Sequence, residues 1–266
     1  LKQPIVVDNR AGAGGLVGAG VMVRSTPDGY TFGVVSGSFA TNAASYKLNY
    51  DPVNDVTLIC LIGESGYLVT LPPAMPIKSI KELIAYARAN PGKIGYGSSG
   101  EGGSTHLATA LFELMAGVKM TQVPYKSAGA MLTALMGGEI QLVFGATMPA
   151  TVPQLRAGRV RAIAITTLKR SNLLPDLPTV AESGVPGYES VVWYGVLGPK
   201  GIPSDIVARW NADITAILNT AEMKERMTPE GLEVPDTSPE YFRKVLRRDI
   251  GKWSKVIKDA KIQIAQ

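Results

Sequence analysis

The sequence predicts an α/β fold with two lobes and a cleft between them, and three observations lead to this prediction. Strand-like and helix-like segments alternate along most of the 266 residues, as in chains of βαβ units. The strand-like segments are near-continuous apolar runs, which is typical of mostly parallel sheets covered on both faces. A Pro- and Gly-rich stretch between Thr167 and Pro186 interrupts the alternation and is expected to form a long loop. Two α/β blocks joined by strands therefore predict two lobes, with ligand contacts in loops that follow strand ends.

The expected elements follow in chain order. Strands are expected where short apolar runs lie between glycine, proline or charged residues, at 4–9, 30–36, 56–63, 67–71, 93–97, 120–125, 139–145, 160–166 and 189–199. Helices are expected where apolar residues recur at helical spacing, at 16–25, 80–90, 105–117, 127–138, 147–158, 205–219 and 243–261. Ser79 is expected to cap the helix at 80–90, and Pro91-Gly92 to end it. Connecting strands at 93–97 and 190–196 would divide the chain into lobe one, residues 1–96 plus 197–266, and lobe two, residues 97–196.

Composition narrows the class of protein. Apolar residues make up 45% of the chain and charged residues 18%, which predicts a well-packed protein rather than a disordered one. One histidine and one cysteine are too few for a His/Cys zinc site, and the acidic residues have no calcium-loop spacing, so we expect no metal and no cofactor. Cys60 lies in the apolar run VTLICLIG and is expected to be a buried apolar side chain.

The net charge of +5 is densest near the C-terminus. Between the basic residues of the 243–261 stretch, apolar side chains recur at helical spacing, namely Phe242, Val245, Leu246, Trp253, Val256 and Ile257. This pattern is typical of an amphipathic helix with a solvated cationic face, so we expect no nucleic-acid partner.

The stretch GYGSSGEGGSTHLA, at 95–108, carries G-x-G-x-x-G as Gly95, Gly97 and Gly100. A dinucleotide site needs an acidic residue about 20 positions later, but that region is KMTQVPYK and has no carboxylate. A hydrolase would use Ser98 or Ser99 with His106, which lies only seven or eight positions away and without a G-x-S-x-G elbow. The serine hydrolase is kept as the alternative function.

Binding without chemistry explains the loops more simply. Ser104 or Thr105 is expected to cap the helix after this loop, while Ser127 and Thr147 are expected to cap the next two. Ser36 and Ser38 follow a strand of lobe one. Hydroxyls and helix N-termini gathered at strand ends favour capture of an oxyanion such as a carboxylate. No strong general base accompanies them, so the chain is not expected to be an enzyme.

Seven motifs together resemble one family. They are VVDNRAGAGGLVGAG, PDGYT, YDPVND, YGSSGEGGSTHLA, VPYKSAG, LPDLPTVAESGVPGYE and WYGVLGPKGIP, in this order along nearly the whole chain. Each is weak alone, but the combination is similar to the Bug-type (TctC-like) solute-binding receptors of tripartite tricarboxylate transporters.

The resemblance implies a two-lobed type II periplasmic-binding-protein fold and a periplasmic receptor, made with a signal peptide in its precursor. It implies a small organic carboxylate as ligand (a di- or tricarboxylate, an aromatic carboxylate or an acidic amino acid), delivered to membrane permease subunits. We expect a monomer. By motif position, the implied ligand-binding residues are Ser36, Ser38, Ser98, Ser99, Gly100, Thr105, His106, Ser127, Ala128, Gly145, Ala146 and Thr147.

The chain departs from the family pattern in three respects. A strand and a Pro-Gly-Gly loop precede the Asn-Arg signature in family members and would lie upstream of Leu1, so either the sequence omits this unit or the chain is truncated. Ala130 replaces a usual proline, while Ala134 and Gly145 occupy positions where acidic residues are frequent.

Two side-chain roles stay open at this point. His106 either donates a hydrogen bond to the ligand or packs in the first helical turn as a neutral side chain with a lowered pKa. The aromatic residues near the cleft either stack on an aromatic acid or belong to the core, namely Tyr46, Tyr125, Trp193 and Tyr194.

Overall fold

In the computed structural model, which describes residues 4–234 and 236–264, helices and strands alternate as in an α/β protein. The elements in chain order are η1 (Ala13–Gly15), α1 (Leu16–Val23), β1 (Gly33–Ser36), α2 (Ser38–Ser45), β2 (Val56–Leu71), α3 (Ile80–Ala89), β3 (Gly95–Ser98), α4 (Ser104–Ala116), β4 (Thr121–Pro124), α5 (Ala128–Met136), β5 (Leu142–Thr147), α6 (Met148–Arg156), β6 (Arg161–Ile165), β7 (Val191–Pro199), α7 (Ser204–Leu218), α8 (Ala221–Met227), η2 (Thr228–Glu230) and α9 (Pro239–Asp259).

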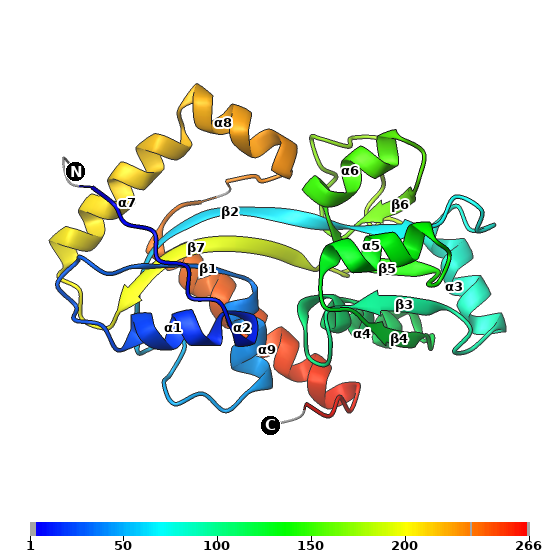
Figure 1. The fold of residues 1–266 in the computed structure, drawn as a ribbon, viewed down its shortest axis with the longest axis horizontal. Coiled ribbons are helices and arrows are strands. Elements are labelled where there is room, and N and C mark those ends of the chain that lie inside the picture. Colours follow the sequence, from blue (N-terminus) through cyan, green and yellow to red (C-terminus); the bar gives the residue numbers. More distant parts are fainter. Residues whose placement is uncertain (1–3, 235, 265–266) are drawn as a thin grey trace.

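The strands form a mixed sheet in the order β1-β7-β2-β5-β3-β4, with β6 also paired to β2. Figure 1 shows two lobes, one around β1 and β7 and the other around β3 to β6, with β2 running through both. The α/β class and the two lobes are confirmed. The expectation of mostly parallel sheets holds only where β3 pairs with β4 and β5, because the other ladders are antiparallel. The physical reason is that β2 leads the chain into lobe two and β7 leads it back. These two neighbouring strands therefore run in opposite directions and pair antiparallel.

β2 is one continuous strand, not the two predicted at 56–63 and 67–71. Its first part, through Gly66, pairs with β7, and its last part, from Tyr67, pairs with β5 and β6. The polar stretch Glu64-Ser65-Gly66 resembles a break in the sequence, but its backbone stays paired opposite Trp193, Val192 and Val191. Cross-strand hydrogen bonds therefore hold a segment that lacks the apolar pattern of a strand.

The segment predicted as a crossover at 93–97 forms β3, which pairs with β4 and β5. Residues of α3 and β3, including Ile80, Leu83 and Tyr96, share a core with Phe112 and Phe144. The predicted boundaries at 96/97 and 196/197 fall within β3 and β7 and remain predictions.

Several local predictions are confirmed. Ser79 caps α3, since its hydroxyl accepts a hydrogen bond from the amide of Glu82. Cys60 is fully buried, and burial raises the pKa of its thiol to about 11. The amphipathic C-terminal helix exists as α9, with Phe242, Val245, Leu246, Trp253 and Val256 on its buried face.

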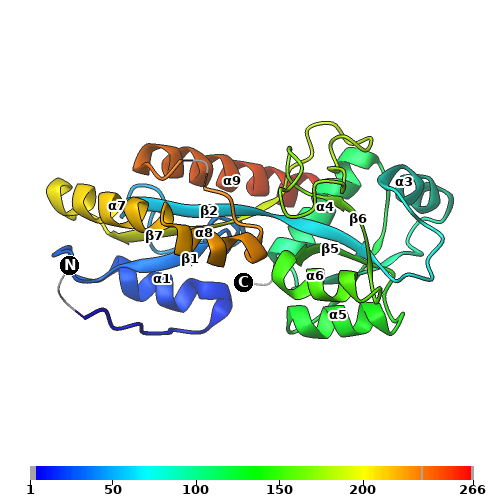
Figure 2. The same cartoon turned by 90° about the horizontal axis from the view of Figure 1, so that it is seen from above.

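α9 contacts both lobes. Phe242, Val245 and Leu246 join the core of lobe one, whereas Trp253 and Val256 pack with Leu107 and Ala110 of α4. Figure 2 shows α9 running along the strands of lobe one toward α4. No helix among the described residues combines the length and the apolar character that a membrane span requires.

Three segments differ from the sequence expectation. Residues 4–9 form no ladder, and Ile5, Val6 and Val7 are 69%, 87% and 78% exposed, because the described chain places no strand beside them. The stretch after Ser36, expected to be a loop, forms α2, whose Phe39 and Ala40 are buried in the core of lobe one. α8 was not predicted, although its N-terminus has a capping residue: the side chain of Thr220 accepts a hydrogen bond from the amide of Met223.

Candidate ligand-binding site

Three parallel strands of lobe two end at the same edge of the sheet. β3 ends at Ser98, which lies opposite Pro124 at the end of β4, and β5 ends at Thr147. The amide of Tyr125 donates to the carbonyl of Ser98 over 2.8 Å, so the strand ends are also bonded to each other. Each strand then leads into the N-terminus of a helix, namely α4, α5 or α6. The edge therefore brings together three loops with partially positive helix ends.

The loop from Ser98 to His106 is held by its own hydroxyls. The fully buried hydroxyl of Ser98 accepts hydrogen bonds from the Gln122 side chain at 2.8 Å and from the Gly100 amide at 3.2 Å. The hydroxyl of Thr105 accepts from the amide of Ser99 at 2.7 Å, and the two hydroxyls lie 3.0 Å apart. Among Ser98, Ser99 and Thr105, the exposed residue is Ser99. Ser98 and Thr105 thus shape the loop, while Ser99 is the residue of the three that solvent reaches.

The predicted cap of α4 by Ser104 or Thr105 is wrong. Gly103 occupies the N-cap position and no side chain caps the helix, because the Thr105 hydroxyl bonds back to Ser99 instead. Ser104 lies beside the buried Tyr67 of β2, whose pKa is raised by burial to about 12.

Gly145 and Thr105 are in close contact. Gly145 has a φ of +123°, and a Cβ at this position would lie 2.9 Å from Cγ2 of Thr105. Glycine is required here, because it permits this backbone conformation and leaves room for α4. The neighbouring Ala146 and Thr147 are half-buried and pair with Leu68 and Tyr67 of β2. Thr147 takes the predicted N-cap position of α6, but its side chain makes no capping bond.

The start of α5 is the exposed part of the edge. Ser127 caps this helix as predicted, since its hydroxyl accepts from the amide of Ala130 at 3.2 Å. Ser127 and Ala128 are both exposed. Ala134, at a position where family members often carry an acidic residue, is buried in an apolar cluster of lobe two with Met131, Leu135 and Ile140.

Lobe one contributes a pair of serines. Ser36 ends β1 and Ser38 begins α2, and their hydroxyls lie 2.9 Å apart. A Cβ on Gly15 would lie 3.9 Å from the Ser38 hydroxyl, so the turn before α1 reaches the same place. The Asn42 side chain fixes this turn by donating to the carbonyl of Gly14 at 3.0 Å.

The two lobes are in contact at the end of α2. A Cβ on Gly102 would lie 3.1 Å from the hydroxyl of Ser45, so the end of α2 contacts the loop before α4. The Ser45 hydroxyl is buried and has no hydrogen-bond partner in the described structure. The serines of lobe one and the loop of lobe two are therefore carried by elements in direct contact.

His106 is a buried side chain engaged by its own loop. Its Nδ1 accepts from the amide of Gly102 at 3.2 Å and lies 3.5 Å from Oε2 of Glu101. Burial lowers the pKa of His106, and the carboxylate of Glu101 partly opposes this effect. The direction agrees with the sequence expectation, but the main cause is desolvation and not the helix dipole.

The geometry does not assemble a Ser-His pair. The hydrogen bonds of Ser98 and Ser99 go to Gln122, Gly100 and Thr105, and that of His106 goes to Gly102. The hydrolase alternative therefore has no observation in its favour. Among residues 4–234 and 236–264, no cluster of three or more His, Cys, Asp or Glu side chains is arranged to hold a metal ion.

Some contributors were not predicted from the sequence. Gln122 was recognisable as an amide side chain in the otherwise apolar strand MTQVPY, but its partner Ser98 lies 24 residues away. No sequence pattern distinguished Tyr67 or Asn42 as a contributor to the site.

Of the aromatic residues, Trp193 belongs to the core, where its Nε1 donates to Asp249. Tyr125 packs against the apolar cluster around Met131 and Leu135, while Tyr46 is exposed and Tyr194 is half-buried.

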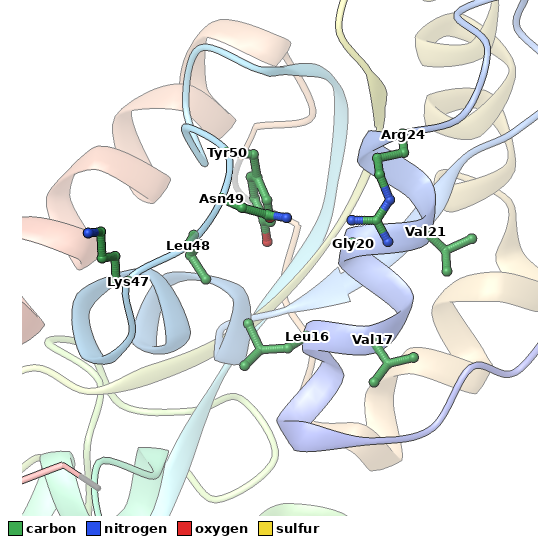
Figure 3. A pocket seen from close by; sticks show the side chains of 9 residues that line it. All are labelled: Leu16, Val17, Gly20, Val21, Arg24, Lys47, Leu48, Asn49 and Tyr50. Carbon is green, nitrogen blue, oxygen red and sulfur yellow. The ribbon is translucent and has the colours of Figure 1, made fainter. Parts of the chain in front are cut away.

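A cavity of about 410 Å³ lies elsewhere in lobe one, between α1 and residues 47–50. Figure 3 shows the Arg24 guanidinium beside Gly20 in this cavity and the Lys47 ammonium directed away from α1. None of the predicted ligand residues lines it. We place the candidate site at the sheet edge, where hydroxyls, buried partners and helix ends coincide.

The two-lobed α/β fold is that of the periplasmic binding proteins, as its likeness to solved structures of that class shows. The model of the tripartite tricarboxylate transporter family receptor matches residues 1–262. The chain belongs to this family, in the group that includes the Bug and TctC proteins.

Individual relatives support this assignment. Protein BugT of Bordetella pertussis is 32% identical over 263 residues, which cover 97% of this chain and 80% of that protein. Rpa4515 of R. palustris, solved with adipate, is 37% identical with a TM-score of 0.85, covering 97% of this chain and 86% of that one. MatC (Rpa3494) of Rhodopseudomonas palustris, solved with bound malate, is 30% identical with a TM-score of 0.81, covering 96% and 88%.

Proposed function

We propose that the chain is a periplasmic receptor that captures a small organic carboxylate and delivers it to the permease subunits of a tripartite tricarboxylate transporter. The ligand is a di- or tricarboxylate, an aromatic carboxylate or an acidic amino acid. The protein acts as a monomer without catalysis, and its precursor carries a signal peptide. The adipate and malate of two similar structures support the dicarboxylate class most directly.

The observation that carries the proposal is the meeting of three helix N-termini and several hydroxyls at one sheet edge. Backbone amides at helix N-termini and neutral hydroxyls bind carboxylates through hydrogen bonds without a fixed cation. We assign the ligand-binding site to Ser36, Ser38, Ser98, Ser99, Gly100, Thr105, His106, Ser127, Ala128, Gly145, Ala146 and Thr147. Within this set, Ser98, Thr105 and His106 act by shaping the loop, because their polar atoms are already bonded to it.

We also propose lobe boundaries at the connections themselves. Lobe two then extends from Tyr67, where β2 leaves β7, to Ser190, whose amide donates to the carbonyl of Thr166. Lobe one consists of the two flanking parts of the chain.

A thermal-shift panel tests the function. Adipate, malate, a tricarboxylate, an aromatic acid and glutamate are each added to the full chain, with adipamide as the uncharged control for adipate. A ligand at about 100 times its Kd adds roughly 2.7 kcal/mol to the free energy of unfolding. At least one acid is expected to raise Tm where its amide does not. If every acid leaves Tm unchanged, the proposal loses its basis.

A further inference from the structure

The two chain connections between the lobes lie side by side. β2 pairs with β7 through Gly66 and with β5 from Tyr67, so the connection is at 65–67. The returning connection is at 189–191, where Ser190 bonds to lobe two and Val191 pairs with Gly66. A relative rotation of the lobes is absorbed at such paired connections, which form the hinge.

α9 is tied to this hinge by charged side chains, of which Asp249 is buried. Asp249 is 1% exposed and accepts hydrogen bonds from Nε1 of Trp193 at 2.9 Å and from Nε of Arg248 at 3.2 Å. Its carboxylate also lies 3.1 Å from Nζ of Lys252. The same two cations reach Glu189 in the hinge, Arg248 through the carboxylate at 3.4 Å and Lys252 through the carbonyl at 3.4 Å. Both cations are therefore already engaged by Asp249 and Glu189.

Glu64 lies in this cluster without a partner of its own. Its backbone is fixed to Glu233 by two hydrogen bonds of 2.8 Å, one residue before the hinge begins. Its Oε1 is buried and accepts no hydrogen bond from any described residue. The charged and titratable groups around it are Tyr241, Arg248, Asp249 and Lys252 of α9, Glu189 of the hinge, and Glu233, whose carboxylate accepts a hydrogen bond from Asn172.

The charges in the cluster do not balance. Three carboxylates, those of Glu64, Glu189 and Asp249, share the two cations Arg248 and Lys252. An ionised carboxylate with a buried, unpartnered oxygen is unfavourable, since it has lost water without gaining a donor.

We propose that Glu64 is a proton-sensitive positioning residue of the hinge. The lobe arrangement described above is favoured when Glu64 is protonated, and ionised Glu64 favours a rotated arrangement in which Oε1 is hydrated. Ligand affinity then depends on pH through the hinge, a consequence that rests on the proposed function.

The direction of the pH effect follows from burial. Desolvation raises the pKa of Glu64 above its ordinary value of 4.5, Arg248 opposes this rise, and Glu189 and Asp249 reinforce it. The proton-linked stabilisation of the described arrangement is thus complete below the ordinary pKa and is lost as pH rises through the raised pKa.

Distances between spin labels test the proposal without any ligand. Labels are placed on Ala85→Cys of α3 and Ala212→Cys of α7, two exposed positions in different lobes. The natural Cys60 is buried and is not expected to react. The distance distribution of the labelled protein is expected to change between pH 5 and pH 8, whereas E64Q keeps the pH 5 distribution at both values. E240Q, which removes an exposed carboxylate at the start of α9 outside this cluster, is expected to retain the pH response. E189Q leaves two carboxylates for the two cations and is expected to weaken the response. A pH response that persists in E64Q, or the lack of one in the parent protein, overturns the proposal.

Thermal stability gives an independent check. At pH 8, E64Q is expected to raise Tm and E189Q to lower it, because Glu189 is paired with Arg248 and Glu64 is not. The gain of E64Q over the parent should shrink as pH approaches the ordinary carboxyl pKa. A gain that is independent of pH contradicts the proposal. Titration with adipate at both pH values then tests the link between the hinge and ligand binding. If adipate does not bind, the result counts against adipate as the ligand. If adipate binds and the pH dependence of its Kd is unchanged in E64Q, the result counts against the proposed role of Glu64 at the hinge.

Discussion

The two lobes contribute unequally to the candidate site. Lobe two has three parallel strands whose carboxyl ends meet, so three helix N-termini lie at one edge. Lobe one has antiparallel ladders, and its contribution is the serine pair between β1 and α2. Parallel strands collect binding groups because every strand end faces the same way, whereas antiparallel neighbours send their ends to opposite edges. Lobe two is therefore expected to supply most of the binding energy, and lobe one to complete the site.

The largest expected effect comes from Gly145→Val, which breaks the contact between β5 and α4. The side chain meets Thr105 and the backbone conformation at +123° becomes strained, so we expect a loss of about 2–4 kcal/mol in unfolding free energy, together with loss of ligand binding. Denaturant unfolding and ligand titration measure both. Gly158→Val is the matched control, since Gly158 also has a positive φ but a Cβ there meets nothing within 4 Å. Equal losses in the two variants would mean that the contact with Thr105 is unimportant.

Single hydroxyl deletions compare the lobes directly. A hydrogen bond to a charged group contributes about 1.5–3 kcal/mol, so Ser99→Ala in lobe two is expected to weaken binding roughly 10- to 100-fold. Ser38→Ala is expected to weaken it less, because Ser36 retains a hydroxyl 2.9 Å away that can take over the contact. Calorimetric titration gives both values, with Ser254→Ala on the exposed face of α9 as control. A larger effect at Ser38 would reverse the proposed division between the lobes.

Two serine caps within lobe two separate stability from binding. Ser127→Ala and Ser79→Ala each remove one capping hydrogen bond and should each cost about 1 kcal/mol of stability. Only Ser127 lies at the proposed site, so only its variant is expected to lower ligand affinity. Thermal denaturation and titration of both variants provide the test, and equal affinities would remove the start of α5 from the site.

The smallest effect is expected from His106. Because the pKa of His106 is lowered by burial, the side chain contributes stability above its ordinary pKa that decreases as pH falls toward the lowered value. His106→Asn, whose side-chain oxygen can still accept from Gly102, should remove this part of the pH dependence between pH 7.5 and 5.5. Melting curves of the parent and the variant across this range measure the difference. Parallel pH profiles would show that His106 does not titrate as proposed.

The sequence predicted most accurately those structural features that depend on residues close together in the chain. The caps at Ser79 and Ser127 and the buried face of α9 were found because each signal lies within a few residues. The continuity of β2 was missed because the partner that holds Glu64-Ser65-Gly66 is contributed by β7, more than 100 residues later.

The candidate site shows the same limit. Its loops were located correctly as strand-to-helix junctions, but the individual roles of Ser98 and Thr105 depend on partners across the fold and across the loop. α2 was missed because SFATNAAS has weak intrinsic helix propensity, and its packing against the lobe-one core stabilises it instead.

The position of α9 after lobe two in the chain also bears on how the protein folds during synthesis. With lobe two taken from Tyr67 to Ser190, as proposed, its core can pack once that stretch has left the ribosome. The core of lobe one includes Phe242, Val245 and Leu246, which are made after that stretch. Since units fold as their residues become available, we expect lobe two to be folded first on the nascent chain, with lobe one exposed until α9 closes it.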